Sequence, residues 1–398
     1  MSSKDLFFVD GDQDAQAKEL LKFIGELRGE TQVDQFVEAA MATGSGSEAV
    51  LRESAGWLAR AEEAQMEAAY NQLFAVVTTE GGSQALDAAA GGIAKDVAAT
   101  AASGAAGLRV LNNLYSLATD GSRPAVFSGI VELAVRTKAM AALVPVVPRL
   151  AKMVGEWGAG AGAGALLALR KAFDEAQFGS EAYGAELAYL EAVGAGGERA
   201  AEVAGSAVVR FANINALCDV DALARLASVQ ELHRAGQLGA AGELLEQLLG
   251  SNYQQWQAYE QANAEKLAAL GVDAAKAGDK MRLLTLASIA SERLGEDVPF
   301  GDVAAAIGVD VEDVELWIID VVRVGLVQGK MNQVTATLMP TRSTYRTFGD
   351  AQWKVLQTRL HQWKESLDAL QPVIHSAKAL AHQQTEQAAG QVHVAAKE

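Results

Sequence analysis

The stretch from Asp279 to Thr337 constrains the fold most, because helical periodicity, period-two alternation and closely spaced glycines all occur within it. Glycine commonly ends helices, since it adopts the left-handed conformation without steric cost. The spacing predicts three helices that start at Asp279, Asp302 and Asp310 and that are closed by Gly295, Gly308 and Gly325. A short extended piece over 298–300 separates the first two.

After the third helix the period changes to two, which is typical of β-strands. A turn at 332–333 is predicted to start the returning strand of a hairpin, in which Val334 and Leu338 face one way. Thr335 and Thr337 face the other way. Helices followed by such a hairpin are typical of a winged helix, and the hairpin is its wing. Val334, Thr335 and Thr337 are therefore candidate partner-binding residues.

The third predicted helix is the usual reader of nucleic acid in a winged helix, so its charges decide whether that role suits this chain. Its apolar stripe consists of Val311, Val314, Ile318 and Val321. Its one cation, Arg323, is outnumbered by four carboxylates: Glu312, Asp313, Glu315 and Asp320. Duplex binding requires Lys and Arg to neutralise phosphates. The charges favour a protein-packing module, with Trp317 in the core or an interface.

Several short segments follow one another in an order that resembles a known family. They are Lys280 to Thr285, Val311 to Glu315, Ile319 to Arg323, Ser343 to Gly349, and Gln352 with Trp353. Together they resemble the PCI-domain family, and within it the subunit M branch of eukaryotic translation initiation factor 3. The Arg-Thr-Phe-Gly segment at 346–349 favours this branch over the related scaffold subunits of the proteasome lid and the signalosome, which stay the close alternative.

This resemblance implies a non-catalytic scaffold subunit that supports assembly of initiation factor 3. It also implies recruitment of mRNA and initiator tRNA to the small ribosomal subunit through that complex, and a cytoplasmic location. The expected partners are the other subunits of the factor, bound partly by a C-terminal helix that joins a multi-subunit helical bundle. The resemblance adds Arg346 and Phe348 to the candidate partner-binding residues.

The C-terminal segment carries a heptad pattern that independently predicts helix-to-helix contact. Large apolar residues recur at alternating steps of three and four, at Trp353, Leu356, Leu360, Trp363, Leu367, Leu370 and Ile374. A stripe of this kind buries itself against other helices. Pro372 is predicted to kink or restart the helix near its end.

Upstream of the winged helix, apolar helical segments alternate with short breaks rich in Gly, Ser and Pro. This pattern predicts a mainly α chain built as a right-handed helical-repeat solenoid, a winged helix and a C-terminal bundle helix. The predicted parts are a solenoid over 1–205, a helical half of the PCI module over 206–277, the winged helix over 278–340, an assembly helix over 341–384 and a disordered tail over 385–398.

The net charge of −17 lies mostly in the first part of the chain. Residues 1–277 carry 21 cations and 35 anions, whereas residues 278–398 carry 12 and 15. Such an acidic body is a poor binder of RNA by itself. No direct sequence-specific binding of nucleic acid is expected, and contact with a ribosome is expected through partners or a local patch such as Arg342 and Arg346. An independent RNA-binding regulator is the alternative from a different class.

No catalytic, cofactor-binding or metal-ligating residue is predicted. The five histidines are scattered without metal-ligand spacing, at His233, His361, His375, His382 and His393. The Gly-Ala run over 158–164 lacks the preceding strand of a dinucleotide site, and Cys218 is predicted to be a packed thiol. No signal peptide or run of about 20 apolar residues occurs. We therefore expect a soluble, non-enzymatic protein without a membrane partner.

Overall fold

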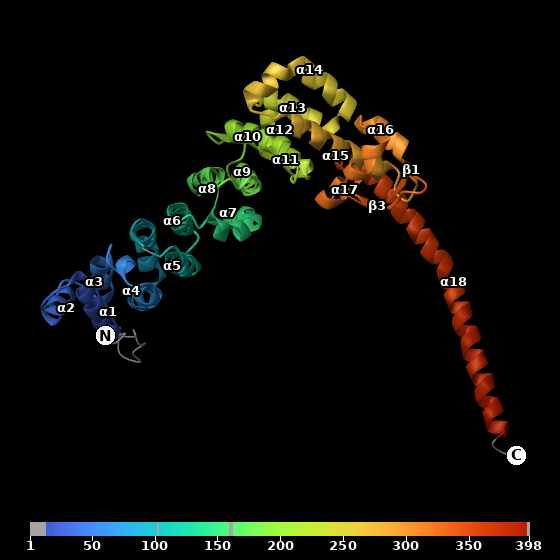
Figure 1. Ribbon diagram of the computed structural model, residues 1–398. Helices are drawn as coiled ribbons and strands as arrows, with labels where there is room; N and C mark the ends of the chain where they lie inside the picture. The colour runs from blue at the N-terminus through green and yellow to red at the C-terminus, as the bar shows by residue number, and fades with distance from the viewer. Residues whose placement is uncertain (1–12, 102, 159–161, 396–398) are drawn as a thin grey trace. The chain divides into compact units, whose positions relative to one another are not determined.

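The computed structural model describes residues 13–101, 103–158 and 162–395 (Figure 1). These residues form a long succession of α-helices and one small sheet, so the prediction of a mainly α chain with a winged helix and a C-terminal helix is confirmed. The chain divides into two compact units, Met1–Thr344 and Tyr345–Glu398. Within the described ranges, no helix combines the length and the apolar character needed to cross a membrane.

The first part of unit one consists of helices that pack on their neighbours in the sequence (Figure 1). Their bounds are α1 Gln13–Arg28, α2 Val33–Met41, α3 Gly46–Ser54, η1 Leu58–Arg60, α4 Glu63–Thr100, α5 Gly104–Leu117, α6 Arg123–Arg136, η2 Met140–Arg149, α7 Leu150–Trp157, α8 Ala163–Glu175, α9 Gly179–Val193 and α10 Ala200–Asn213. Helix α4 bends at Gly82, whose φ of +68° only glycine adopts readily. One apolar core runs through these helices and into the sheet.

Four further helices lead to the winged helix, and their bounds are α11 Val220–Arg225, α12 Ala227–Arg234, α13 Gly239–Gly250 and α14 Tyr253–Leu270. Asn252 caps α14 through a capping box with Gln255, in which each side chain accepts a backbone N–H. Two of the domain boundaries proposed from the sequence lie inside helices, because 205/206 falls in α10 and 277/278 falls in the helix that begins at Ala274.

The winged helix has the predicted order of elements. They are α15 Ala274–Glu292, β1 Val298–Pro299, α16 Phe300–Ile307, η3 Val311–Asp313, α17 Val314–Val324, β2 Val327–Asn332 and β3 Thr337–Ser343. The antiparallel sheet has the order β1-β3-β2, and Leu338 pairs with both Val298 and Met331. Gly308 and Gly325 close α16 and α17 in the left-handed conformation, as predicted.

Two predicted helix starts in this domain, at Asp279 and Asp302, are wrong, and α16 begins at Phe300 instead of Asp302. Asp279 does not cap α15, because Asp273 accepts the N–H groups of Ala275 and Lys276 and starts the helix earlier. The helix at Asp310 begins as a single 3-10 turn, so Val311 stays 51% exposed and lies outside the buried stripe of Val314, Ile318 and Val321. The sequence alone does not show which Asp caps a helix when two of them, such as Asp273 and Asp279, both precede apolar helical residues.

The returning strand of the wing, β3, begins later than predicted, at Thr337 instead of Val334. Residues 333–336 form the connecting turn, in which the Asn332 side chain accepts the N–H of Val334 and Ala336 has a φ of +48°. Val334 is therefore 96% exposed at the tip instead of facing the core, and Thr335 is also exposed. Thr337 is partly buried at the start of β3. Local hydrogen bonding by Asn favours a turn over a continued strand.

Lys280 joins the helical part of unit one to the winged helix. Its side chain is 2% exposed, and its ammonium donates to the backbone carbonyls of Phe211, Ile214 and Leu217, the last two at 2.6 and 2.8 Å. These carbonyls lie at the end of α10 and in the loop after it, where the helix dipole favours a cation. The ammonium also lies 3.7 Å from the centre of the Phe211 ring.

We expect Lys280 to make stability depend on pH. Burial lowers the pKa of Lys280 from 10.5 to about 7. Above pH 7 the unfolded chain therefore binds more protons at this residue than the folded chain does, so its contribution to stability rises with pH, by at most about 1.4 kcal/mol per pH unit. Urea unfolding at pH 7, 8 and 9 should show that the free energy of unfolding of the wild type rises with pH relative to that of Lys280→Met. A constant difference would show that Lys280 titrates alike in both states.

Unit two contains one long helix, α18 Asp350–Ala395. Residues 385–395, which were predicted to belong to a disordered tail, continue this helix, because Ala, Gln and Glu have high helix propensity. Residues 396–398 of that tail lie outside the described residues. Pro372 lies inside α18, which is continuous across it, so the predicted restart of the helix is wrong.

Candidate protein-interaction surfaces

The segment before α18 orders the first turn of that helix. Gly349 N–H donates to the Gln352 side chain at 3.0 Å, and Trp353 N–H donates to the Gly349 carbonyl at 3.1 Å. The Phe348 ring packs edge-on against Trp353, with centroids 4.9 Å apart, and Tyr345 packs against Phe348. The aromatic residues of the segment thus form a small cluster that fixes the first residue of the apolar stripe.

The heptad residues of α18 form an exposed apolar stripe. Their exposed fractions are 59% for Trp353, 38% for Leu356, 53% for Leu360, 64% for Trp363, 48% for Leu367, 52% for Leu370 and 56% for Ile374. Full burial of such side chains stabilises a structure by roughly 1.5 to 3 kcal/mol each. Contiguous exposed apolar surface is typical of interaction sites, so the stripe stays a candidate site.

Two further apolar residues of α18 are exposed that the heptad pattern did not single out, and only Val373 of these borders the stripe. Val355 and Val373 are 44% and 61% exposed. Val373 lies at a heptad position that flanks the stripe, as do the exposed side chains of Arg359 and Lys364. Flanking positions in coiled coils pair with charges of the opposite sign, so these cations favour helices with acidic flanks.

Helix α17 carries a second exposed apolar surface, which sequence reasoning missed. Leu316, Ile319 and Val322 are 61%, 51% and 41% exposed, and they lie three residues apart on one face. The periodicity identified only the buried face, because α17 is apolar on both sides. Trp317 is partly buried against the core and lies 5.2 Å below the guanidinium of Arg282, which confirms its prediction as a packing residue.

The remaining predicted site residues are divided between the two units, and within unit one the hydroxyls of Thr335 and Thr337 lie 2.8 Å apart. Val334 and Thr335 are exposed at the wing tip, and Thr337 lies at the start of β3. Arg342 is exposed on β3 in unit one, whereas Arg346 belongs to unit two and is partly buried, which lowers its pKa to about 10. The two arginines are therefore unequal in accessibility.

The described residues show no group of three or more His, Cys, Asp or Glu side chains that could hold a metal ion. Cys218 is partly buried, and its thiol lies 3.4 Å from the Ala216 carbonyl. Burial raises the pKa of this thiol, which disfavours the reactive thiolate. Among the described residues, the exposed apolar surfaces of α17 and α18 are the candidate functional features.

Comparison with known proteins first defines the class. Residues 274–340 match the family model of the PCI domain, and this range begins at α15 and ends within β3. The winged helix is thus similar to that of PCI-domain proteins. Residues 346–374 match a second family model, the C-terminal helix of eIF3 subunit M, which spans the aromatic segment and the apolar stripe of α18.

Curated proteins similar to this chain are named subunit M of eukaryotic translation initiation factor 3, as in the second family model. The chain is 44% identical over 120 residues to eukaryotic translation initiation factor 3 subunit M of Phaeosphaeria nodorum, which covers 30% of this chain and 27% of that protein. Subunit M of Neosartorya fischeri is 42% identical over 28% of this chain and 24% of its own length. Subunit M of Aspergillus fumigatus is 42% identical over 30% of this chain and 26% of its own length. The matched region thus spans about a quarter of the curated relatives.

Proposed function

We propose that the chain is a non-catalytic scaffold subunit of the eukaryotic translation initiation factor 3 complex in the cytoplasm. In this role it binds other subunits of the factor and supports the recruitment of mRNA and initiator tRNA to the small ribosomal subunit through the complex. The observation that carries the proposal is the match of residues 346–374 to the helix of subunit M, because that range contains the exposed stripe of α18.

The apolar stripe supplies the means of assembly in this proposal. An isolated helix that leaves seven large apolar side chains in water is adhesive, and partner helices cover such a stripe by knobs-into-holes packing. Arg359 and Lys364 at its flanks favour partner helices with Glu or Asp at the facing positions. The PCI domain alone is equally compatible with a lid or signalosome scaffold, whereas the helix match favours initiation factor 3.

Affinity purification of the tagged full-length chain, followed by mass spectrometry, tests the proposal. We expect initiation factor 3 subunits to co-purify in fixed proportion, with no enrichment of proteasome-lid or signalosome subunits. Enrichment of either of those sets in place of initiation factor 3 would assign the chain to the other assembly.

We expect the isolated chain to bind RNA weakly and without sequence preference. The net charge of −17 repels phosphate, and the turn η3 before α17 carries Glu312 and Asp313 where a nucleic-acid reader needs cations. Titration with labelled RNA at about 150 mM salt should give dissociation constants no tighter than the non-specific range of ~10⁻⁴ to 10⁻⁶ M. Sub-micromolar, sequence-dependent binding would favour the RNA-binding regulator instead.

A further inference from the structure

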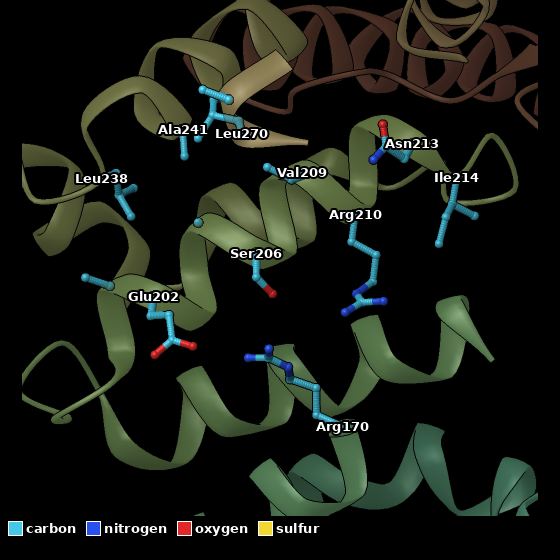
Figure 2. A pocket seen from close by; sticks show the side chains of 13 residues that line it. Arg170, Glu202, Ser206, Val209, Arg210, Asn213, Ile214, Leu238, Ala241 and Leu270 are labelled. Atoms are coloured by element: carbon cyan, nitrogen blue, oxygen red, sulfur yellow. The ribbon is translucent and has the colours of Figure 1, made fainter. Parts of the chain in front are cut away.

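A groove beside α10 and a pocket beside α5 lie in the helical part of unit one, and their charges differ. Figure 2 shows Arg170 and Arg210 in the groove beside α10. Arg210 pairs with Asp174 at 2.6 Å and with Glu186 at 3.1 Å, and Arg170 lies 3.5 Å from Glu186. The cations of this groove are thus compensated by carboxylates of the chain itself.

The pocket beside α5 has a volume of ≈ 550 Å³ and mostly apolar walls. It lies between α5, α6, the 3-10 helix η2 and the start of α7. Its aliphatic and aromatic lining includes Leu108, Tyr115, Phe127, Ile130, Leu143 and Met153. Ligand pockets commonly have volumes of roughly 300 to 1,000 Å³ and apolar walls with few polar groups. The pocket can therefore accept apolar side chains of a ligand.

Two parts of the pocket wall are held rigidly by the fold. Trp157 donates its Nε1–H to the Tyr115 hydroxyl at 3.0 Å, and its ring lies 5.3 Å from that of Phe127. The wall formed by η2 belongs to a helix that contains Pro145 and Pro148, whose rings restrict the backbone. A ligand does not have to order these walls, which lowers the entropy cost of binding.

The charge at the pocket is positive and accessible. Of the two arginines in the lining, Arg109 donates to Glu67 at 2.7 Å, so its charge is compensated. Arg149 is exposed and pairs with no carboxylate of the described residues. Residues 104–157 carry six cations and three anions, although the whole chain has a net charge of −17. This local reversal of charge attracts an acidic partner to Arg149.

We propose that this pocket binds a segment of a partner protein in which an aliphatic residue stands beside Glu or Asp. The aliphatic side chain enters the pocket against Phe127 and Leu143, and the carboxylate pairs with Arg149. Nucleic acid fits less well, because its backbone requires several cations and the charge of Arg109 is already compensated.

The opening of the pocket favours a protein segment over a small acid. Asn112, Ala142 and Arg149 are exposed parts of its lining, so the pocket is open to solvent. A small acid would leave much of its surface in water there, whereas small-ligand sites bury most of their ligand. A protein segment can span the opening. The inference concerns residues outside α18 and does not depend on the proposed function.

The apolar and the charged parts of the site can be changed separately. Ala142→Phe fills the mouth of the pocket, and Ala141→Phe is its matched control, because Ala141 is also exposed on η2 but lies outside the lining. Arg149→Gln removes the charge, and Lys152→Gln is its control, because Lys152 is an exposed cation outside the lining. Thermal melting shows whether each variant stays folded.

Titration of the full-length chain with acetylated and amidated tetrapeptides tests the proposal, with the NMR signal of the Met153 methyl group in the lining as the readout. We expect Glu-Leu-Leu-Glu to bind and to shift this signal. Gln-Leu-Leu-Gln should bind about three- to fivefold more weakly, as for an exposed ion pair, and Glu-Ser-Ser-Glu should not bind.

The variants should separate the two contributions. Ala142→Phe should lose binding of Glu-Leu-Leu-Glu, and Arg149→Gln should remove the difference in affinity between the Glu and Gln peptides that contain Leu. Ala141→Phe and Lys152→Gln should bind as the wild type does. Because the peptides are compared on the wild-type chain, the test does not depend on the folding of any variant.

Four results would overturn the proposal. Equal affinity of the wild type for Glu-Leu-Leu-Glu and Gln-Leu-Leu-Gln would show that the carboxylate is not recognised. No shift of the Met153 signal with either of these peptides would show that the pocket takes no side chain. A shift with octanoate but not with the peptides would make it a site for a small acid, and a shift with oligouridylate alone would make it a nucleic-acid site.

Discussion

Replacing Leu360 and Leu367 together by Asp is expected to remove the chain from its complex while leaving its own fold intact. Both side chains are about half exposed on α18, so the free chain loses little packing when they are changed. In an assembled helical bundle each replacement loses roughly 1.5 to 3 kcal/mol of apolar burial, and the buried carboxylates add to this cost. The sum corresponds to an affinity loss of at least about a hundredfold.

Co-purification of initiation factor 3 subunits with the tagged variant measures this effect, and thermal melting of the purified chain checks its fold. Thr358→Asp with Gln362→Asp is a matched control, because it adds the same charge to the face of α18 away from the stripe. The control should assemble normally. Normal recovery of the subunits with the Leu360 and Leu367 variant would disprove the assembly role, and a lower melting temperature would show that the stripe packs on its own chain.

Leu284→Asp is expected to destabilise unit one by about 4 kcal/mol or more. Leu284 is 2% exposed on α15, which packs against α10, α14, α16, α17 and β3. The substitution removes a buried aliphatic side chain, worth about 2 to 5 kcal/mol, and places a carboxylate among buried apolar side chains. Since α15 contacts both the helical part and the sheet, the loss should weaken both of them together.

Ile319→Asp is the matched control for this experiment, because the same charge is introduced at a position that is 51% exposed on α17. Urea unfolding of the full-length variants should show a large shift for Leu284→Asp and a small one for Ile319→Asp. If both variants unfold like the wild type, Leu284 is accessible to water. A large shift for Ile319→Asp alone would instead make the outer face of α17 part of the core.

Much of the winged helix could be predicted from local sequence. Gly308 and Gly325 end their helices because the left-handed conformation at those positions favours glycine, and this preference needs no tertiary contact. The stripe of α18 was also predictable, since its three-and-four spacing is a property of one helix. The wrong predictions concern positions where the local sequence allows two structures. Asp273 and Asp279 could each cap α15, and Val334 could lie in a turn or in a strand.

Only the tertiary structure decided which polar side chains are buried together. Lys280 reaches carbonyls more than 60 residues away, and Arg210 of α10 pairs with Asp174 of α8 and Glu186 of α9. The packing of α17 likewise determined which of its two apolar faces is exposed. Periodicity records that a face is apolar, because that follows from the geometry of a single helix. Whether another element covers that face depends on residues distant in the chain, and so on the fold as a whole.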